Sequence, residues 1–202
     1  VRSDPSEQLK APKVEKQFPE VLSVEEIERL LEQPSTDSFK GIRDKAMLEL
    51  LYATGIRVSE LISLQTADVN LKMDYVCCHS EGKERIIPFE QATHHALLQY
   101  LDKRQELQKN EAPYLFINHR GTGISRQGVW KIIKQYASLA GIEKQITPHM
   151  IRHSFASHLV ENGADLKAVQ EMMGHSALST TQMYVRRDAS RLKEVYEQTH
   201  PR

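Results

Sequence analysis

The sequence lacks the usual signals of a disulfide-stapled, secreted or membrane-spanning chain. Its two cysteines, Cys77 and Cys78, are adjacent, and neighbouring residues rarely form a disulfide with each other. No apolar run approaches the roughly 20 residues that span a bilayer, and no secretory signal pattern opens the chain. We therefore expect a protein of the reducing cytoplasm with no membrane partner.

An excess of charge of either sign is also absent, because 27 basic residues balance 27 acidic ones. Domains that bind nucleic acid are often strongly basic, so the bulk charge argues mildly against such a partner. A neutral protein can still carry a local basic cleft. The question of function therefore depends on where particular basic residues stand.

Internal repeats and low-complexity tracts are absent, and 202 residues suffice for one sizeable domain or two small ones. Helical spacing of apolar residues dominates. One expected helix begins at Ser23 and comes before a loop at 34–38. The other expected helices cover residues 42–54, 57–64, 92–109, 125–141, 147–163, 165–173, 180–186 and 189–198. A β-hairpin is expected over 74–89, with its turn near Glu81 and Gly82, and a short strand over 114–117. The fold class is therefore mainly α with a small antiparallel β-sheet.

Several helix ends carry explicit signals. Ser23, with Glu26 three residues later, has the pattern of a capping box. Thr147 followed by Pro148 is the usual order of an N-cap and the first helical residue. Gly55 is the residue type that most often ends a helix, which makes it the expected end of the second helix.

Three parts are expected along the chain. Residues 1–20 are polar and contain three prolines, which is typical of an extended linker. The chain opens with Val1 rather than Met, so we expect a fragment from which an N-terminal domain is missing. Residues 21–187 form the main domain, and residues 188–202 form a C-terminal helix and tail.

A set of basic and phenolic side chains falls at the ends of the expected helices. His149 and Arg152 share one helix face because they are three residues apart. Arg57 stands at a helix-to-helix junction. His175 follows a helix end, and Tyr184 comes nine residues later.

These side chains suit chemistry on a phosphodiester. Guanidinium groups match phosphate oxygens as planar forks of donors, and fixed cations stabilise the charge of a pentacoordinate phosphorane without a metal. A phenol has a pKa of about 10, which nearby cations would lower, and a histidine would accept its proton. The set predicts attack of a tyrosine on phosphorus, with neither metal nor cofactor.

Three motifs carry a resemblance to a known family. The stretch ATGIRVSEL at 53–61 resembles the first arginine motif of tyrosine recombinases, and TPHMIRHSFA at 147–156 resembles their His-x-x-Arg motif. MGHS at 173–176 with STTQMY at 179–184 resembles their Gly-His and tyrosine segment. Order, spacing and flanks agree over about 21–202. The sequence is most similar to the Xer-type members of this phage integrase family.

The resemblance implies a role for each candidate residue. Tyr184 would attack the scissile phosphate to give a 3′-phosphotyrosine and a free 5′-hydroxyl. Arg57 and Arg152 would hold the phosphate oxygens. His149 would act as a base or phosphate donor, and His175 as a further donor.

Two further positions concern the surroundings of the reaction. Glu60, three residues after Arg57, is expected to orient that guanidinium. Family members usually carry a lysine in the hairpin turn, within Gly-Lys-Gly-x-Lys-Glu-Arg, that protonates the leaving 5′-oxygen. Here the stretch at 79–85 is HSEGKER, with a single lysine. Either Lys83 is this acid in a shortened turn, which we favour, or Lys83 matches the outer lysine and Ser80 stands at the acid's place.

The resemblance also implies the partners and the setting. They are double-stranded DNA, a homo- or hetero-tetramer of recombinase subunits on two DNA sites, a core-binding domain before the linker, and a bacterial, nucleoid-associated location in chromosome segregation or DNA integration. The tail carries an apolar stripe at helical spacing, formed by Leu192, Val195, Tyr196 and Thr199. The resemblance implies that this stripe docks on a neighbouring protomer; the alternative is that it folds back on its own domain.

Other interpretations remain open. The altered lysine favours a DNA-binding module that has lost catalysis, and a type IB topoisomerase would share the same chemistry. Tyr196 is a rival nucleophile, although no Gly-His precedes it. The helix over 127–135, with Lys131 and Lys134, either faces DNA or is an ordinary solvated surface.

Two candidate zinc sites are discounted. His149 and His153 stand at zinc-binding spacing, but no glutamate follows the first histidine and Arg152 would lie beside the metal. Cys77, Cys78 and His79 are successive residues of a strand, and successive strand residues point to opposite faces.

Overall fold

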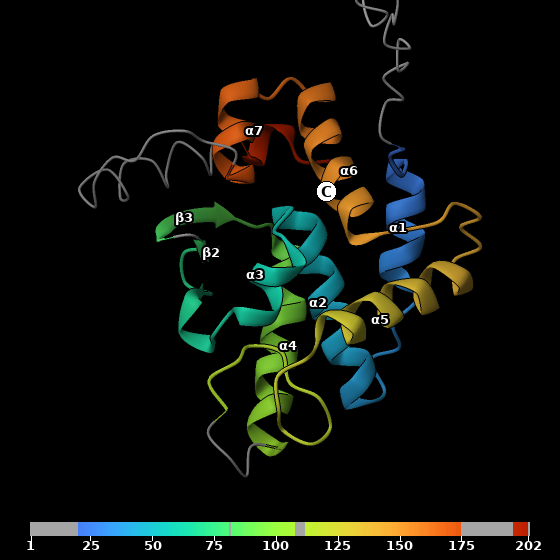
Figure 1. Ribbon diagram of the computed structural model, residues 1–202, viewed down its shortest axis with the longest axis vertical. Helices are drawn as coiled ribbons and strands as arrows, with labels where there is room; N and C mark the ends of the chain where they lie inside the picture. The colour runs from blue at the N-terminus through green and yellow to red at the C-terminus, as the bar shows by residue number, and fades with distance from the viewer. Residues whose placement is uncertain (1–19, 81, 108–111, 175–195, 202) are drawn as a thin grey trace, which may run out of the picture.

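The computed structural model describes residues 20–80, 82–107, 112–174 and 196–201 (Figure 1). Its helices are α1 Val24–Glu32, α2 Phe39–Thr54, α3 Val58–Ser63, α4 Gln91–Leu107, α5 Arg126–Leu139, α6 Pro148–Glu161 and α7 Leu166–Met173, with a 3₁₀ turn at Thr66–Asp68. Strands β1 Val69–Asn70, β2 Tyr75–Ser80 and β3 Lys83–Pro88 form one antiparallel sheet in the order β1-β2-β3. The predicted fold class, mainly α with a small antiparallel sheet, is confirmed.

The helix ends that carry explicit sequence signals are found where the sequence placed them. Ser23 and Glu26 form both bonds of the capping box, and the Thr147 hydroxyl accepts the Met150 N–H at 3.1 Å. Gly55 ends α2 with φ +55°, in the left-handed region that favours glycine. A Cβ at this position would also collide with the ring of Phe155 on α6. The glycine thus permits the sharp exit from α2 that leads to Arg57.

The start of α2 and the number of strands in the sheet differ from expectation. Helix α2 begins at Phe39 rather than at 42, because the Ser38 hydroxyl caps it by accepting the Gly41 N–H at 3.1 Å. The sheet has a third strand, β1, that was not predicted; its two residues, Val69 and Asn70, pair with Val76 and Tyr75. Two residues are too few for an alternating pattern, so the sequence carries no signal for this strand.

The predicted strand at 114–117 is wrong. The segment makes isolated bridges, Gln65 to Tyr114 and Ile117 to Gly123, instead of a ladder. Its backbone bonds instead to several separate segments and to a side chain. The Leu115 N–H donates to the Leu64 carbonyl at 2.6 Å, the Phe116 carbonyl accepts the Ile124 N–H at 3.1 Å, and the Tyr100 hydroxyl bonds the Leu115 carbonyl at 2.9 Å and the Ile117 N–H at 3.0 Å. A short apolar run is therefore buried here without a continuous neighbouring strand.

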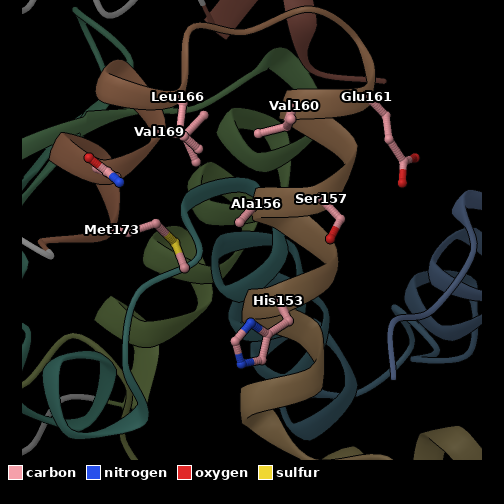
Figure 2. Close-up of a pocket in the computed structure, with 9 residues that line it drawn as sticks. His153, Ala156, Ser157, Val160, Glu161, Leu166, Val169 and Met173 are labelled. Atoms are coloured by element: carbon pink, nitrogen blue, oxygen red, sulfur yellow. The ribbon is translucent and has the colours of Figure 1, made fainter. Parts of the chain in front are cut away.

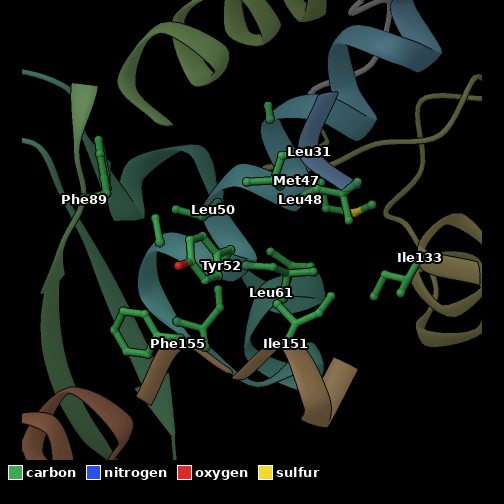
Figure 3. Close-up of a cluster of buried hydrophobic side chains, with 14 of the residues drawn as sticks. Leu31, Met47, Leu48, Leu50, Tyr52, Leu61, Phe89, Ile133, Ile151 and Phe155 are labelled. Carbon is green, nitrogen blue, oxygen red and sulfur yellow. The ribbon is translucent and has the colours of Figure 1, made fainter. Parts of the chain in front are cut away.

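Helix α2 lies at the centre of the fold and is buried along most of its length. It packs against α4 and α6, while β3 contacts α7 at one side of the molecule and α1 contacts α5 at another (Figure 1). Figure 3 shows the core around α2, which includes Leu50 and Tyr52 of α2 and Ile151 and Phe155 of α6. Among the described residues, no helix combines the length and apolarity needed to cross a membrane.

The described end of the chain packs on its own domain. Tyr196 is 1% exposed and Thr199 6% exposed. The Tyr196 ring stacks on His200 with centroids 4.6 Å apart, and Asn162 at the end of α6 donates to the Thr199 carbonyl at 2.8 Å. These two stripe residues therefore lie in the chain's own core, which is what the fold-back alternative expects. Leu192 and Val195 lie outside the described residues.

Candidate active site

Arg57 is placed by the junction between α2 and α3, where it is the N-cap residue of α3. The Glu60 carboxylate accepts the Arg57 backbone N–H at 2.7 Å and an Nη1 hydrogen at 3.3 Å. The Arg57 side chain is 36% exposed and that of Glu60 only 4%. The expectation that Glu60 orients Arg57 is confirmed. The buried Glu60 carboxylate bonds one side of the guanidinium, and part of the Arg57 side chain remains exposed to solvent.

A second arginine, Arg85 on β3, shares the same carboxylate. It donates to both Glu60 oxygens, at 2.7 and 2.8 Å, and its Nε donates to the Met172 carbonyl at 2.8 Å. Sequence reasoning treated Arg85 only as part of the hairpin. The signal that points to it is its register: Arg85 pairs with Cys78, which is fully buried, so its side chain must face the protein.

Arg152 completes the set from α6. It is 6% exposed, and its guanidinium donates to the carbonyls of Gly55 and Met173. One side chain thus ties the end of α2 to the end of α7. We call Arg57, Glu60, Arg85 and Arg152 the arginine cluster.

The arginine cluster holds three cations and one anion. Burial opposes ionisation of Glu60, but the bonds from Arg85 and Arg57 and their charges outweigh it and lower the pKa of Glu60. Burial and then the positive charges of Arg57 and Arg85 lower the pKa of Arg152 to about 10. Arg152 remains a cation at neutral pH, desolvated and repelled by its neighbours. A bound anion would relieve that repulsion, so the charge of the cluster suits an anionic ligand.

The hairpin presents the candidate acid to this cluster. Lys83 is the first residue of β3 and pairs directly with Ser80. Side chains alternate along a strand, so Lys83 shares a face with Arg85, and Ser80 shares the same face. Both candidate positions for the acid therefore stand on the side of the sheet that meets the cluster, and the register does not choose between them.

The remaining predicted residues divide into exposed and undescribed ones. His149 is exposed in the first turn of α6, one turn before Arg152. His175 and Tyr184 lie outside the described residues. The last described residue before them is Gly174, whose carbonyl lies 3.5 Å from Arg57 Nη2 and whose φ is +64°. The segment that carries His175 and Tyr184 therefore starts at the arginine cluster.

Tyr196 is not suited to be the nucleophile. Its hydroxyl is buried and donates to Glu90. Burial, reinforced by the charge of Glu90, raises the pKa of Tyr196 well above its ordinary value. Both effects work against a phenolate, so the rival candidate of the sequence analysis is removed.

A groove of about 400 Å³ lies between α6 and α7. Figure 2 shows His153 on the α6 wall and Met173 on the α7 wall; the remaining wall residues are mainly apolar, among them Val160 and Leu166. The groove adjoins the arginine cluster through Met173, whose carbonyl accepts from Arg152. It gathers no set of groups for catalysis.

The exposed face of α5 carries Lys131, Lys134 and Trp130. The Lys134 Nζ lies 3.8 Å from the centroid of the Trp130 ring. An exposed aromatic with two lysines suits a nucleic-acid surface as well as a solvated one, and both readings of this helix stay open.

Comparison with known proteins agrees with the motifs and with the fold. The phage integrase family profile matches residues 20–191. Tyrosine recombinase XerD of Staphylococcus epidermidis is 50% identical over 202 residues, which cover 98% of this chain and 68% of that protein. The crystal structure of XerA recombinase matches with a TM-score of 0.73 and 35% identity over 92% of this chain and 67% of that one. The XerH recombinase bound to its palindromic difH substrate in a post-cleavage complex matches with a TM-score of 0.70 and 29% identity, covering 88% and 52%. The chain therefore belongs to the phage integrase family, and it is a tyrosine site-specific recombinase.

Proposed function

We propose that this chain breaks and rejoins DNA strands through a 3′-phosphotyrosine on Tyr184, with Arg57 and Arg152 holding the scissile phosphate. The observation that carries the proposal is the arginine cluster, which lies where the segment that contains Tyr184 begins. Two of its guanidinium groups share the Glu60 carboxylate, and the third, that of Arg152, donates to the carbonyls of Gly55 and Met173. Two of the three are largely desolvated, where a charge–charge interaction is strongest.

In the proposed step, the Tyr184 oxygen forms a bond to phosphorus and the bond from phosphorus to the 5′-oxygen breaks. The phenolic proton passes to a base, for which His149 is the candidate. The departing 5′-oxygen takes a proton from an acid, Lys83 or a group at the place of Ser80. His175 donates a further hydrogen bond to the phosphate. The reverse step, attack by a 5′-hydroxyl on the phosphotyrosine, rejoins the strand.

Fixed guanidinium groups supply the charge stabilisation that a metal ion supplies in other phosphoryl-transfer enzymes. In the proposed mechanism strand cleavage therefore needs no metal. The phosphotyrosine replaces one phosphate ester by another, so the free energy of the phosphodiester is retained and ATP is not required.

The proposed partners follow from the same chemistry. A duplex of DNA supplies the phosphodiester, and recombination needs two such sites held together, for which we infer a tetramer of recombinase subunits. The similarity to XerH, which was solved bound to its difH substrate, supports DNA as the substrate. The linker expected at 1–20 would join this domain to a core-binding domain on the other side of the duplex.

A suicide DNA substrate, nicked so that religation fails, tests the proposal against a module that only binds. We expect a covalent protein–DNA adduct that resists denaturation and forms equally well in EDTA. A complex that binds but leaves no adduct would support the binding module instead. An adduct that requires added zinc or magnesium would overturn the metal-free mechanism.

A further inference from the structure

A second constellation lies on the face of the hairpin that points away from the arginine cluster. Cys77 Sγ, a ring nitrogen of His79 and a carboxylate oxygen of Glu84 all lie within 4.8 Å of one another. The sheet register brings them together: Cys77 and His79 are two apart on β2, and His79 pairs with Glu84 on β3. Only Cys78 points to the other face, so the earlier objection to this stretch applies to Cys78 and not to these three residues.

The imidazole of His79 is placed between two carboxylates. Its Nδ1 lies 3.2 Å from Glu84 Oε1, and its Nε2 lies 3.1 Å from Asp68 Oδ1. A neutral imidazole has one N–H, so it can donate to one of them and would turn a lone pair toward the other. Either a second proton or a metal ion at the unprotonated nitrogen resolves this conflict.

The thiol of Cys77 favours the metal ion over the second proton. An imidazolium would bond both carboxylates and leave no role for the sulfur of Cys77. A metal ion would use the sulfur, Nδ1 of His79 and the Glu84 oxygen as three ligands. Asp68 would then accept the Nε2–H, which is the outer carboxylate that metal-bound histidines commonly have.

We propose that Cys77, His79 and Glu84 bind a divalent transition-metal ion of the zinc class, with Asp68 orienting the histidine. Ligand bonds to zinc of about 2.0–2.3 Å place neighbouring ligands roughly 3.5 Å apart, so small side-chain rotations close the present spacing. The side chains of His79 and Glu84 are 52% and 62% exposed, which leaves them free to rotate and open to solvent. Water would complete the coordination.

Such a site would bind the ends of β2 and β3 together beside Lys83, the neighbour of Glu84. It would stabilise the hairpin by mass action without entering the strand-cleavage chemistry, because its ligands occupy the opposite face of the sheet from Arg85. Cleavage in EDTA and metal binding at this site are therefore compatible.

Titration of the full chain with Co²⁺ under reducing conditions tests the proposal. We expect thiolate-to-cobalt charge-transfer absorption, which added Zn²⁺ removes by displacement. Cys77→Ala should abolish the band, whereas the matched variant Cys78→Ala should keep it because that thiol is buried on the other face. Circular dichroism checks that each variant is folded.

Variants at exposed or outer positions keep the test decisive if a cysteine variant does not fold. His79→Gln and Glu84→Gln should weaken Co²⁺ binding by more than the roughly ten-fold that we expect for Asp68→Asn. Absence of a thiolate band in the folded wild-type chain would overturn the proposal. Co²⁺ binding without that band, which the exposed pair His149 and His153 would give, would overturn it equally.

Discussion

At the scale of single residues, the site depends on one carboxylate that serves two arginines. Glu60 holds Arg57 and Arg85 while Arg152 donates to backbone carbonyls, so positive charge exceeds negative charge where the tyrosine segment begins. The surplus is fixed before any substrate arrives. A phosphate that gains charge in the transition state would then meet donors that need not reorganise.

Loss of Arg57 or of Arg152 should slow cleavage far more than it weakens DNA binding. We expect Arg57→Ala and Arg152→Ala each to reduce the single-turnover cleavage rate by on the order of 100-fold or more. Arg29→Ala, at an exposed position on α1, is the matched control and should cleave normally. A rate near that of the wild type in either test variant would show that this arginine does not contact the phosphate.

The sheet register does not decide whether Lys83 or the position of Ser80 supplies the acid that protonates the leaving 5′-oxygen. If Lys83 protonates the 5′-oxygen, Lys83→Ala should be slow on ordinary DNA and restored by a 5′-bridging phosphorothiolate, because sulfur leaves without a proton. Ser80→Ala, changed on the directly paired residue, should then need no rescue. The reverse pattern would assign the acid role to the position of Ser80.

At the scale of elements, Glu60 joins three of them: it lies on α3, binds Arg85 of β3, and through Arg85 reaches the end of α7. Its pKa is lowered in the folded protein, so its stabilising contribution is full above its ordinary value of 4.5 and is lost as the pH falls through the lower folded value. The pH dependence of unfolding therefore reports this connection.

We expect Glu60→Gln to reduce the free energy of unfolding at neutral pH by on the order of 3 kcal/mol, because it leaves buried guanidinium charge without its partner. The difference from the wild type should shrink as the pH falls below 4.5. Urea titrations at several pH values measure this, with exposed Glu28→Gln as the control. A difference that is constant with pH would contradict an ionised Glu60.

The described end of the chain supports a second prediction at this scale. Ending the chain at Val195 removes Tyr196 and Thr199 from the core. Loss of one buried aromatic costs about 3–5 kcal/mol, so the melting temperature should fall on the order of 10 °C. Gln198→Ala, at an exposed position, should melt like the wild type. A truncated chain with an unchanged melting temperature would show that this segment packs elsewhere in solution.

Local signals predicted most of the helices because helix caps and helix-ending glycines depend on interactions between residues that are close in sequence. Ser23 with Glu26, Thr147 with Pro148, and Gly55 each determine a helix end with neighbours only a few residues away. The prediction of a strand at 114–117 failed because the backbone partners of this segment are scattered over Leu64, Ile124 and the Tyr100 hydroxyl, which no periodicity reveals. A strand and a buried loop have the same apolar pattern when no continuous strand lies beside them.

The residues of the site also divide into those that local sequence signals predicted and those that they did not. Arg57 and Arg152 were identified because motifs place them, and Glu60 because it lies three residues from Arg57. Arg85 was missed because its partner Glu60 is 25 residues distant and only the folded sheet brings them together. The metal-site candidate was discounted because three successive residues were considered without the cross-strand partner Glu84.

At the scale of the whole molecule, a chain with no net charge contains a concentrated positive site. The 27 basic and 27 acidic residues cancel in total, yet the arginine cluster gathers three cations around one anion. Attraction of a phosphate to this chain would therefore be local rather than a property of its overall field. This explains why bulk composition argued weakly against nucleic acid while the motifs argued for it.

The central claim is that Tyr184 forms the covalent bond to DNA. The most direct measurement is adduct formation on a nicked suicide substrate in EDTA, comparing Tyr184→Phe with Tyr196→Phe. The account predicts no adduct from Tyr184→Phe despite normal DNA binding, and adduct from Tyr196→Phe, whose lost hydroxyl is buried against Glu90. An adduct that persists in folded Tyr184→Phe would contradict the assignment of the nucleophile and the mechanism built on it.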